Sequence, residues 1–164
     1  MKIGTHIPLW RVPILQDGTL SFSSLTSFEG EYFVLCCIQS LTVTQTRLLK
    51  SQSDDFLNTH ARLIALLNHD RNHEFPWPPP EFSLRLPLLT DPLQRLSRPL
   101  GLSQHLSIER CETLIFNQDS RLEFRLIHDF NQSGFTRVLE MTKQLIEQNH
   151  HTNLLQDALV GSGT

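Results

Sequence analysis

Residues 31–47, EYFVLCCIQSLTVTQTR, decide the fold of this chain. The first part, Tyr32 to Ile38, is continuously apolar and rich in aromatic and β-branched residues, which predicts a strand covered on both faces of a sheet. The second part, Gln39 to Thr46, consists mainly of hydroxyl and amide side chains, placed where a helix would leave its first backbone N–H groups unpaired. The stretch therefore predicts a buried strand that leads through a polar turn into a helix.

The composition indicates one globular domain. The chain has 164 residues, of which 39% are apolar, and this is enough to build an ordinary core. The formal net charge is -3 and the Lys and Arg residues are scattered, so we expect no nucleic-acid partner. The sequence shows no signal-peptide pattern and no apolar run of about 18 residues. We therefore expect no membrane span and a soluble, cytoplasmic protein.

The cysteines and histidines predict no metal site and no cofactor. Three cysteines, two of them adjacent, form neither a disulfide framework nor a C-x-x-C pair, which is compatible with a reducing compartment. Cys36 and Cys37 lie within the apolar strand, where burial raises the pKa of a thiol, so we expect both to be small core residues. The eight histidines are distributed over separate segments, which favours surface positions over metal ligands.

The remaining apolar runs predict a mixed α/β sheet. The further predicted strands are Val12 to Leu15, Thr19 to Phe22, Arg62 to Leu67, Leu84 to Leu89, Thr113 to Phe116 and Leu122 to Ile127. We expect one helix after Gln45, a short helix that opens at Asp91-Pro92 and ends near Gly101, and a helix over Phe135 to Glu147. Strands joined by helices, with a late hairpin and a terminal helix, indicate a three-layer α/β sandwich of the thioredoxin-like type.

Two segments are expected to lie outside the regular elements. The proline-rich FPWPPP, residues 75–80, predicts an exposed, rigid connection rather than a ligand for an aromatic-groove domain. Residues 149–164 turn polar and end in Gly-Ser-Gly-Thr, which predicts a flexible tail. We therefore expect residues 1–148 to form the folded domain.

Four segments carry motifs in an order that points to one family. Residues 3–10 read IGTHIPLW, residues 17–25 read DGTLSFSSL, residues 86–92 read LPLLTDP, and the hairpin at residues 113–121 reads TLIFNQDSR. These segments resemble the I-G-x-x-A-P-x-F, D-G-x-x-v-s-L-s-d-l, f-P-l-l-s-D-p and t-f-i-i-D-x-x-G motifs of the peroxiredoxins of the alkyl hydroperoxide reductase C and thiol-specific antioxidant type. The resemblance covers most of residues 3–148 and implies the peroxiredoxin variant of the thioredoxin-like fold, with an N-terminal hairpin.

The resemblance also implies a catalytic site that this chain does not reproduce. In the family motif P-x-x-x-T-x-x-C, the cysteine attacks peroxide, the threonine orients the peroxide oxygens, and a distant arginine lowers the thiol pKa. Placing Thr42 on the motif threonine puts Gln45 at the cysteine position, and a glutamine amide cannot be oxidised as a thiolate is. Counting back from Asn117 puts the arginine position on Cys111, with Arg110 beside it. No counterpart of the family's resolving V-C-P motif follows Gln148.

Two functions remain open. In the first, the chain is a non-catalytic member of the peroxiredoxin type that binds a partner protein, or a small ligand held where peroxide would have been. In the second, it is an active thiol oxidoreductase that uses Cys111 with help from Thr42 and Arg110, and a thioredoxin-like reductant. A homodimer is compatible with either function.

Overall fold

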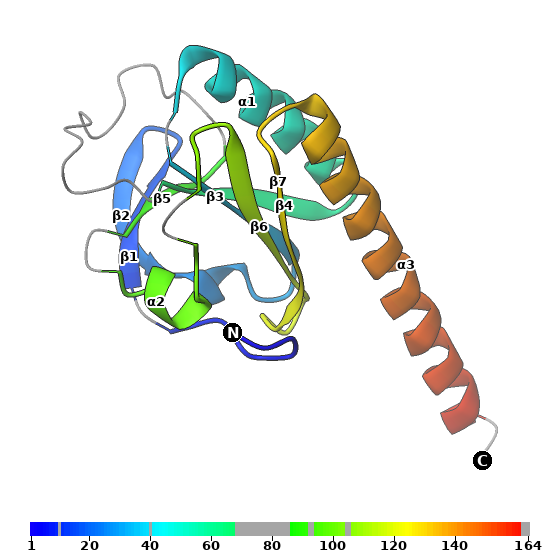
Figure 1. Ribbon diagram of the computed structural model, residues 1–164. Helices are drawn as coiled ribbons and strands as arrows, with labels where there is room; N and C mark the ends of the chain where they lie inside the picture. Colours follow the sequence, from blue (N-terminus) through cyan, green and yellow to red (C-terminus); the bar gives the residue numbers. More distant parts are fainter. Residues whose placement is uncertain (10, 40, 68–85, 92–93, 104–105, 162–164) are drawn as a thin grey trace.

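A computed structural model describes residues 1–9, 11–39, 41–67, 86–91, 94–103 and 106–161. Within this part of the chain, seven strands form one mixed sheet in the order β2-β1-β5-β4-β3-β6-β7 (Figure 1). The strands are β1 Arg11–Gln16, β2 Thr19–Ser24, β3 Tyr32–Ile38, β4 Ala61–Leu67, β5 Leu88–Thr90, β6 Arg110–Phe116 and β7 Leu122–Asp129. The helices are the 3-10 turn η1 Leu25–Phe28, α1 Val43–Leu57, α2 Ser97–Leu100 and α3 Gln132–Gly161.

The predicted central strand is confirmed as β3. It pairs in parallel with β4 and antiparallel with β6, and all seven of its residues are buried. Alternate side chains enter two separate cores, as the pleat of a strand requires. One core lies under α1 and α3, and the other lies under η1 and α2 (Figure 1). The expected three-layer α/β sandwich is therefore the observed fold.

Both predicted hairpins are present. β1 and β2 pair antiparallel around a turn in which Asp17 and Gly18 have φ angles of 51° and 76°. Glycine adopts such left-handed angles without steric cost, and Asp tolerates them. β6 and β7 pair antiparallel across residues 117–121, where Asn117 Oδ1 accepts hydrogen bonds from the backbone N–H groups of Asp119 and Arg121.

The segment between β4 and β6 differs from the prediction. β5 begins at Leu88, and the proline-rich residues 75–80 lie outside the described part of the chain. The short helix ends at Gly101 as predicted, but it begins at Ser97 and not at Asp91. The buried Asp91 carboxylate accepts hydrogen bonds from the backbone N–H groups of Arg95, Leu96 and Ser97 instead, which orders the turn before the helix.

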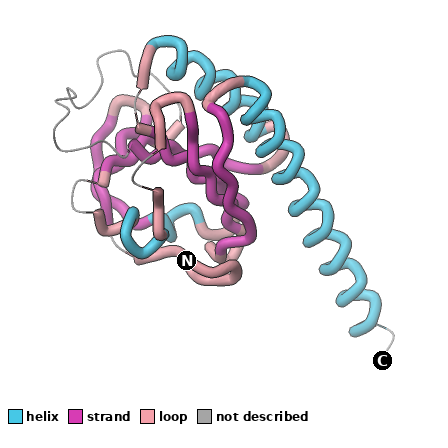
Figure 2. The backbone as a smooth tube through the Cα atoms, viewed as in Figure 1, coloured by secondary structure: helices cyan, strands magenta, loops and turns pink. Residues whose placement is uncertain are grey.

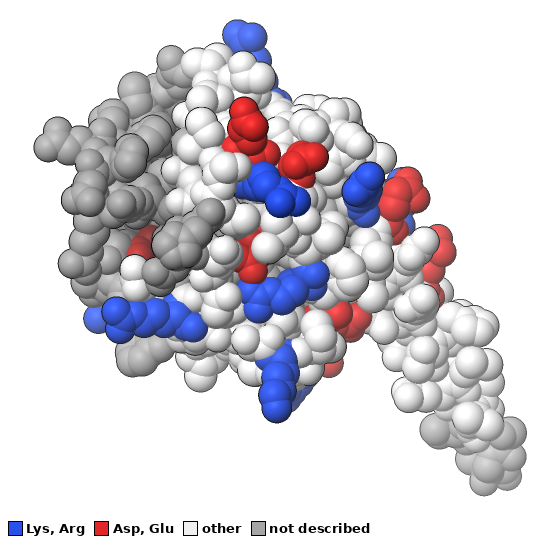
Figure 3. All heavy atoms as spheres, viewed as in Figure 1, with Lys and Arg blue, Asp and Glu red and all other residues white. Residues whose placement is uncertain are grey.

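The last helix is longer than predicted. α3 continues through Gly161, where a flexible tail was expected from residue 149. Between Gly134 and Gly161 the sequence contains no Pro or Gly, so nothing interrupts the helical hydrogen bonds. The second half of α3 extends past the sheet (Figure 2), and the side chains of Leu154, Leu155 and Leu159 are exposed there. Lys, Arg, Asp and Glu side chains are scattered over the body in the view of Figure 3, while the visible end of α3 carries few of them.

Candidate functional site

The N-terminus of α1 is the position at which the resemblance places the chemistry. Thr42 is the N-cap of the helix, and its Oγ1 accepts a hydrogen bond from the backbone N–H of Gln45 at 3.2 Å. The side-chain Oε1 of Gln45 accepts in return from the backbone N–H of Thr42 at 3.0 Å. This reciprocal capping box pairs two of the N–H groups that a helix start would otherwise leave to solvent. Thr42 and Gln45 are thus in direct contact at the start of the helix.

Gln45 also ties the helix to the segment before β6. Its Nε2 donates a hydrogen bond to the carbonyl oxygen of Ile108 at 3.0 Å. The two ends of the amide group therefore have different roles: Oε1 caps the helix, and Nε2 is hydrogen-bonded to the segment that leads into β6. A neutral side chain in this position fixes the local structure and offers no nucleophile.

Arg110 opens β6 at the surface. Its side chain is 51% exposed, and Nε lies 3.7 Å from Oδ1 of Asp129 on β7. An exposed ion pair of this length contributes little to stability. The ion-pair partner of Arg110 is therefore the exposed Asp129 on β7, and not a buried carboxylate.

Cys111 points away from the surface. Its side chain is 0% exposed and belongs to the core under α3, together with Cys36 and Phe135. Burial raises the pKa of the Cys111 thiol far above its usual range, and the neighbouring Cys36 thiol raises it further. A thiol in this setting remains protonated, which is opposite to what a peroxide-reactive cysteine needs.

The other two cysteines are also core residues. Cys36 faces the same core as Cys111, and Cys37 faces the opposite core. Burial raises the pKa of Cys37 well above its usual value, with smaller contributions from Cys36 and Glu112. Because the chain has three cysteines in all and each is buried, it presents no thiol to solvent.

Within the described ranges, no group of three or more His, Cys, Asp or Glu side chains could hold a metal ion. His69 and His73 are four residues apart in the sequence, but they lie outside those ranges. Among the described helices, none has the length and apolar character needed to cross a membrane.

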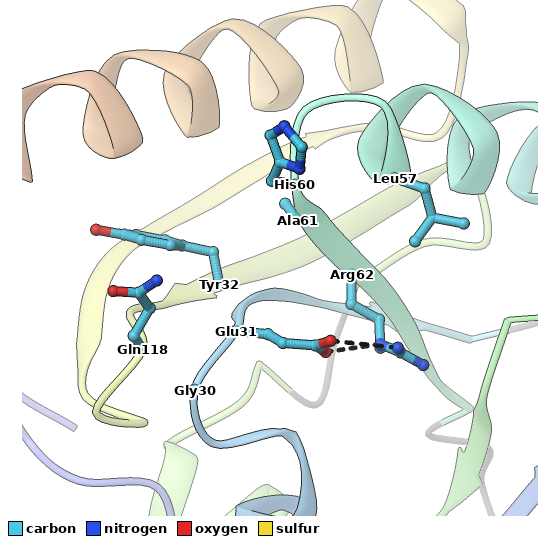
Figure 4. Close-up of a pocket in the computed structure, with 8 residues that line it drawn as sticks. All are labelled: Gly30, Glu31, Tyr32, Leu57, His60, Ala61, Arg62 and Gln118. Carbon is cyan, nitrogen blue, oxygen red and sulfur yellow. Dashed lines mark hydrogen bonds and ion pairs between the residues drawn. The ribbon is translucent and has the colours of Figure 1, made fainter. Parts of the chain in front are cut away.

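Sequence reasoning missed a pocket at the other end of α1. It is lined by residues that include Tyr32, Leu57, His60 and Gln118, together with an ion pair between Glu31 and Arg62 (Figure 4). The lining comes from the starts of β3 and β4, the end of α1 and the turn between β6 and β7. No motif could have revealed it, because these segments meet only in the folded sheet.

Several solved structures with a similar fold are peroxiredoxins. The mitochondrial 2-Cys peroxiredoxin of Plasmodium falciparum is 13% identical over 91% of this chain and 96% of that one, with a TM-score of 0.72. The 2-Cys peroxiredoxin of Plasmodium vivax is 14% identical over 93% of this chain and 99% of that one, with a TM-score of 0.69. For AhpC of Mycobacterium tuberculosis the identity is 17%, the coverages are 87% and 93%, and the TM-score is 0.65. No protein-family model and no curated protein matches the sequence. The resemblance is therefore confirmed at the level of the fold.

Proposed function

We propose that this chain, which shares the fold of the 2-Cys peroxiredoxins, acts by binding rather than by reducing peroxides. One observation carries the proposal: the helix start that would activate a cysteine holds Gln45, and all three cysteines of the chain are buried. Thiol-dependent reduction needs a thiolate that peroxide can reach. Neither the residue at position 45 nor the thiols of β3 and β6 meet that requirement.

The surface around Gln45 supports binding to a protein partner. The hydrogen bond to Ile108 brings the first turn of α1 next to the segment before β6. Val43 and Ile108 are 46% and 58% exposed, and Thr42 adds an exposed hydroxyl group. Exposed apolar side chains beside polar groups are suited to a protein interface. We name Thr42, Val43, Gln45 and Ile108 the α1-start surface.

The alternative is an active thiol oxidoreductase that uses Cys111. The observation in its favour is that Cys111 and Cys36 lie in the same core, where the Cys36 thiol also raises the pKa of Cys111. Burial opposes it, because the raised pKa of Cys111 leaves almost no thiolate at neutral pH. The binding function therefore has the stronger support.

The test is hydrogen peroxide consumption with dithiothreitol as reductant. We expect no turnover by the wild type or by Cys111→Ser, and turnover by Gln45→Cys, since the helix N-terminus lowers the pKa of a thiol placed there. Ser51→Cys is the matched control, because it adds an exposed thiol to the middle of α1, away from the helix N-terminus. Peroxide turnover by the wild type that is lost in Cys111→Ser would overturn the proposal.

A second copy of the chain is the first partner to examine. Sedimentation velocity of the wild type and of Ile108→Asp measures self-association through the α1-start surface. A dimer that dissociates in Ile108→Asp and persists in Glu140→Gln, an exposed change on α3, would identify the partner as another copy. A monomer at all concentrations would direct the search to other proteins.

A further inference from the structure

Two pockets meet at Tyr32 and Gln118, at the end of the sheet opposite Gln45. The larger has a volume of about 340 Å³ and lies between the end of α1 and the starts of β3 and β4 (Figure 4). The smaller has a volume of about 190 Å³ and lies between the β6–β7 turn and α3. Cavities of roughly 300 Å³ or more are typical of sites for small ligands. We call the two together the Tyr32 pocket.

The larger part offers apolar contact and little net charge. Leu57 is 50% exposed on one wall, with Ala61 nearby. The Arg62 guanidinium lies 5.6 Å from the centre of the Phe28 ring, and its Nε lies 2.9 Å from Oε2 of Glu31. Because the charges of Arg62 and Glu31 compensate each other, an aliphatic group can lie against Leu57 without meeting an unpaired charge.

The smaller part is rich in oxygen atoms and negatively charged. Glu123 is half-buried, and its Oε1 accepts hydrogen bonds at 3.0 Å from the side-chain amides of Asn117 and Asn149. In the part of the chain that the structure describes, its Oε2 has no hydrogen-bond partner, and neither Glu123 nor Asp119 pairs with a cationic side chain. The smaller part is thus lined by two carboxylates, and none of the described residues that line it is cationic.

Tyr32 joins the two parts. The amide of Asn149 donates a hydrogen bond to its hydroxyl oxygen. Burial raises the pKa of the Tyr32 phenol; the Asn149 bond lowers it, and the charges of Glu123 and Asp119 raise it. The hydroxyl therefore remains protonated near neutral pH. Because it lies inside the pocket close to Glu123, a signal from the Tyr32 ring should change when a charged group binds beside Glu123.

We propose that the Tyr32 pocket binds an aliphatic primary ammonium group, with the ammonium beside Glu123 and Asp119 and the aliphatic part against Leu57. A cation would supply the partner that Oε2 of Glu123 lacks, and charge-assisted hydrogen bonds are the strong ones. The ammonium can come from a free alkylamine or from a lysine side chain of another protein. This inference goes beyond the binding function proposed for Gln45, which lies about 20 Å away at the other end of α1.

The test uses the single tyrosine of the chain. Protein labelled with ¹³C at the tyrosine Cζ is titrated at pH 7.5 with n-butylammonium chloride, and separately with 1-butanol, which has the same aliphatic part and no charge. We expect a saturable shift of the Tyr32 Cζ resonance and of the Leu57 and Gln118 amides with butylammonium only. Equal shifts with both compounds, or none with either, would overturn the proposal.

Variants locate the cation. Glu123→Gln keeps an oxygen that can accept from the two Asn amides but removes the charge, and we expect it to weaken butylammonium binding about tenfold. Asp119→Asn, on the exposed turn, should weaken it less and remain folded in any case. Glu140→Gln, an exposed change on α3 outside the pocket, is the matched control and should bind as the wild type does. Unchanged affinity in both pocket variants would overturn the proposal.

A pair of peptides distinguishes the two sources of the ammonium group. Acetylated and amidated Gly-Lys-Gly is compared with the same peptide carrying norleucine, which lacks the ammonium. Tighter binding of the lysine peptide than of butylammonium would identify a protein side chain as the ligand. Binding of butylammonium alone would identify a free amine.

Discussion

The side-chain amide of Gln45 donates to the carbonyl oxygen of Ile108, a residue 63 positions further along the chain, while the same side chain caps its own helix at Thr42. A residue that stands where a peroxidatic cysteine would be expected is therefore a structural link between α1 and the start of β6. Both hydrogen bonds need the amide group of Gln45, so a cysteine at this position could not make them.

Replacing Gln45 should reduce stability through two separable contacts. We expect Gln45→Ala to lower the free energy of unfolding by about 1–2 kcal/mol, since it removes both the bond from the Thr42 N–H to Oε1 and the bond to Ile108. Gln45→Glu keeps the capping box and loses the donor to Ile108, so it should cost less. Urea denaturation of the two variants measures the difference. Equal losses in both would mean that the cap contributes nothing.

Gly134 should tolerate no side chain. A Cβ at this position would overlap the carbonyl oxygen of Asp129 and lie 2.9 Å from Nδ1 of His128. Because the backbone of β7 would have to move, we expect Gly134→Ala to destabilise the protein by about 2–3 kcal/mol. Ser133→Ala, one residue earlier and exposed, is the control and should change stability little. Thermal unfolding of both variants tests this, and a native-like melting temperature for Gly134→Ala would contradict it.

His128 should make the protein less stable in acid. It is buried, with Nε2 2.6 Å from Thr113 Oγ1 and Nδ1 2.9 Å from the carbonyl oxygen of Asp129. Burial lowers the pKa of His128, and although Asp129 raises it, the net shift is downward. In the unfolded chain this imidazole has its ordinary pKa of about 6.5, so as the pH falls the unfolded chain binds a proton at His128 before the folded protein does. The folded protein therefore keeps its full free energy of unfolding, as far as His128 is concerned, above about pH 6.5. It loses part of that free energy as the pH falls from about 6.5 towards the lowered pKa of His128.

Denaturation between pH 7.5 and 5 measures that loss. We expect His128→Asn to flatten the dependence of unfolding free energy on pH, with a difference of up to about 1.4 kcal/mol per pH unit. His60→Asn is the control, because His60 is exposed and its left-handed φ of 62° suits Asn. The same pH slope in wild type and His128→Asn would show that other groups cause the acid sensitivity.

The thiols should react only when the protein unfolds. Cys36, Cys37 and Cys111 are at most 4% exposed, so iodoacetamide at pH 8 should label none of them in the native protein. Labelling rates should rise with urea in step with global unfolding, as followed by mass spectrometry. The new cysteine in Gln45→Cys should react in the absence of urea and serves as the positive control. Rapid labelling of native Cys111 would restore the thiol oxidoreductase as a function.

Much of the fold could be predicted because the deciding signals are local. The apolar run of β3 and the Asp17-Gly18 turn each depend on a few neighbouring residues, and both appear where expected. The predicted polar stretch after β3 contains the start of α1, although the helix begins at Val43 and not after Gln45. The start of α2 could not be predicted, because Asp91 is hydrogen-bonded to N–H groups four to six residues away and does not begin the helix. The prediction ends the last helix at Glu147 because the residues that follow are polar, but no Pro or Gly breaks the helix before Gly161.

The sequence by itself determined the sheet, the order of its elements and the absence of a cysteine at the start of α1, because periodicity, turn residues and residue identity are properties of the chain. Only the tertiary structure decided that Cys111 is buried beside Cys36, that Gln45 is bonded to Ile108, and that Glu123 and Leu57 line adjoining pockets around Tyr32. The reason is physical: burial and electrostatic environment depend on segments that lie far apart in sequence and meet only when the sheet and its helices have packed.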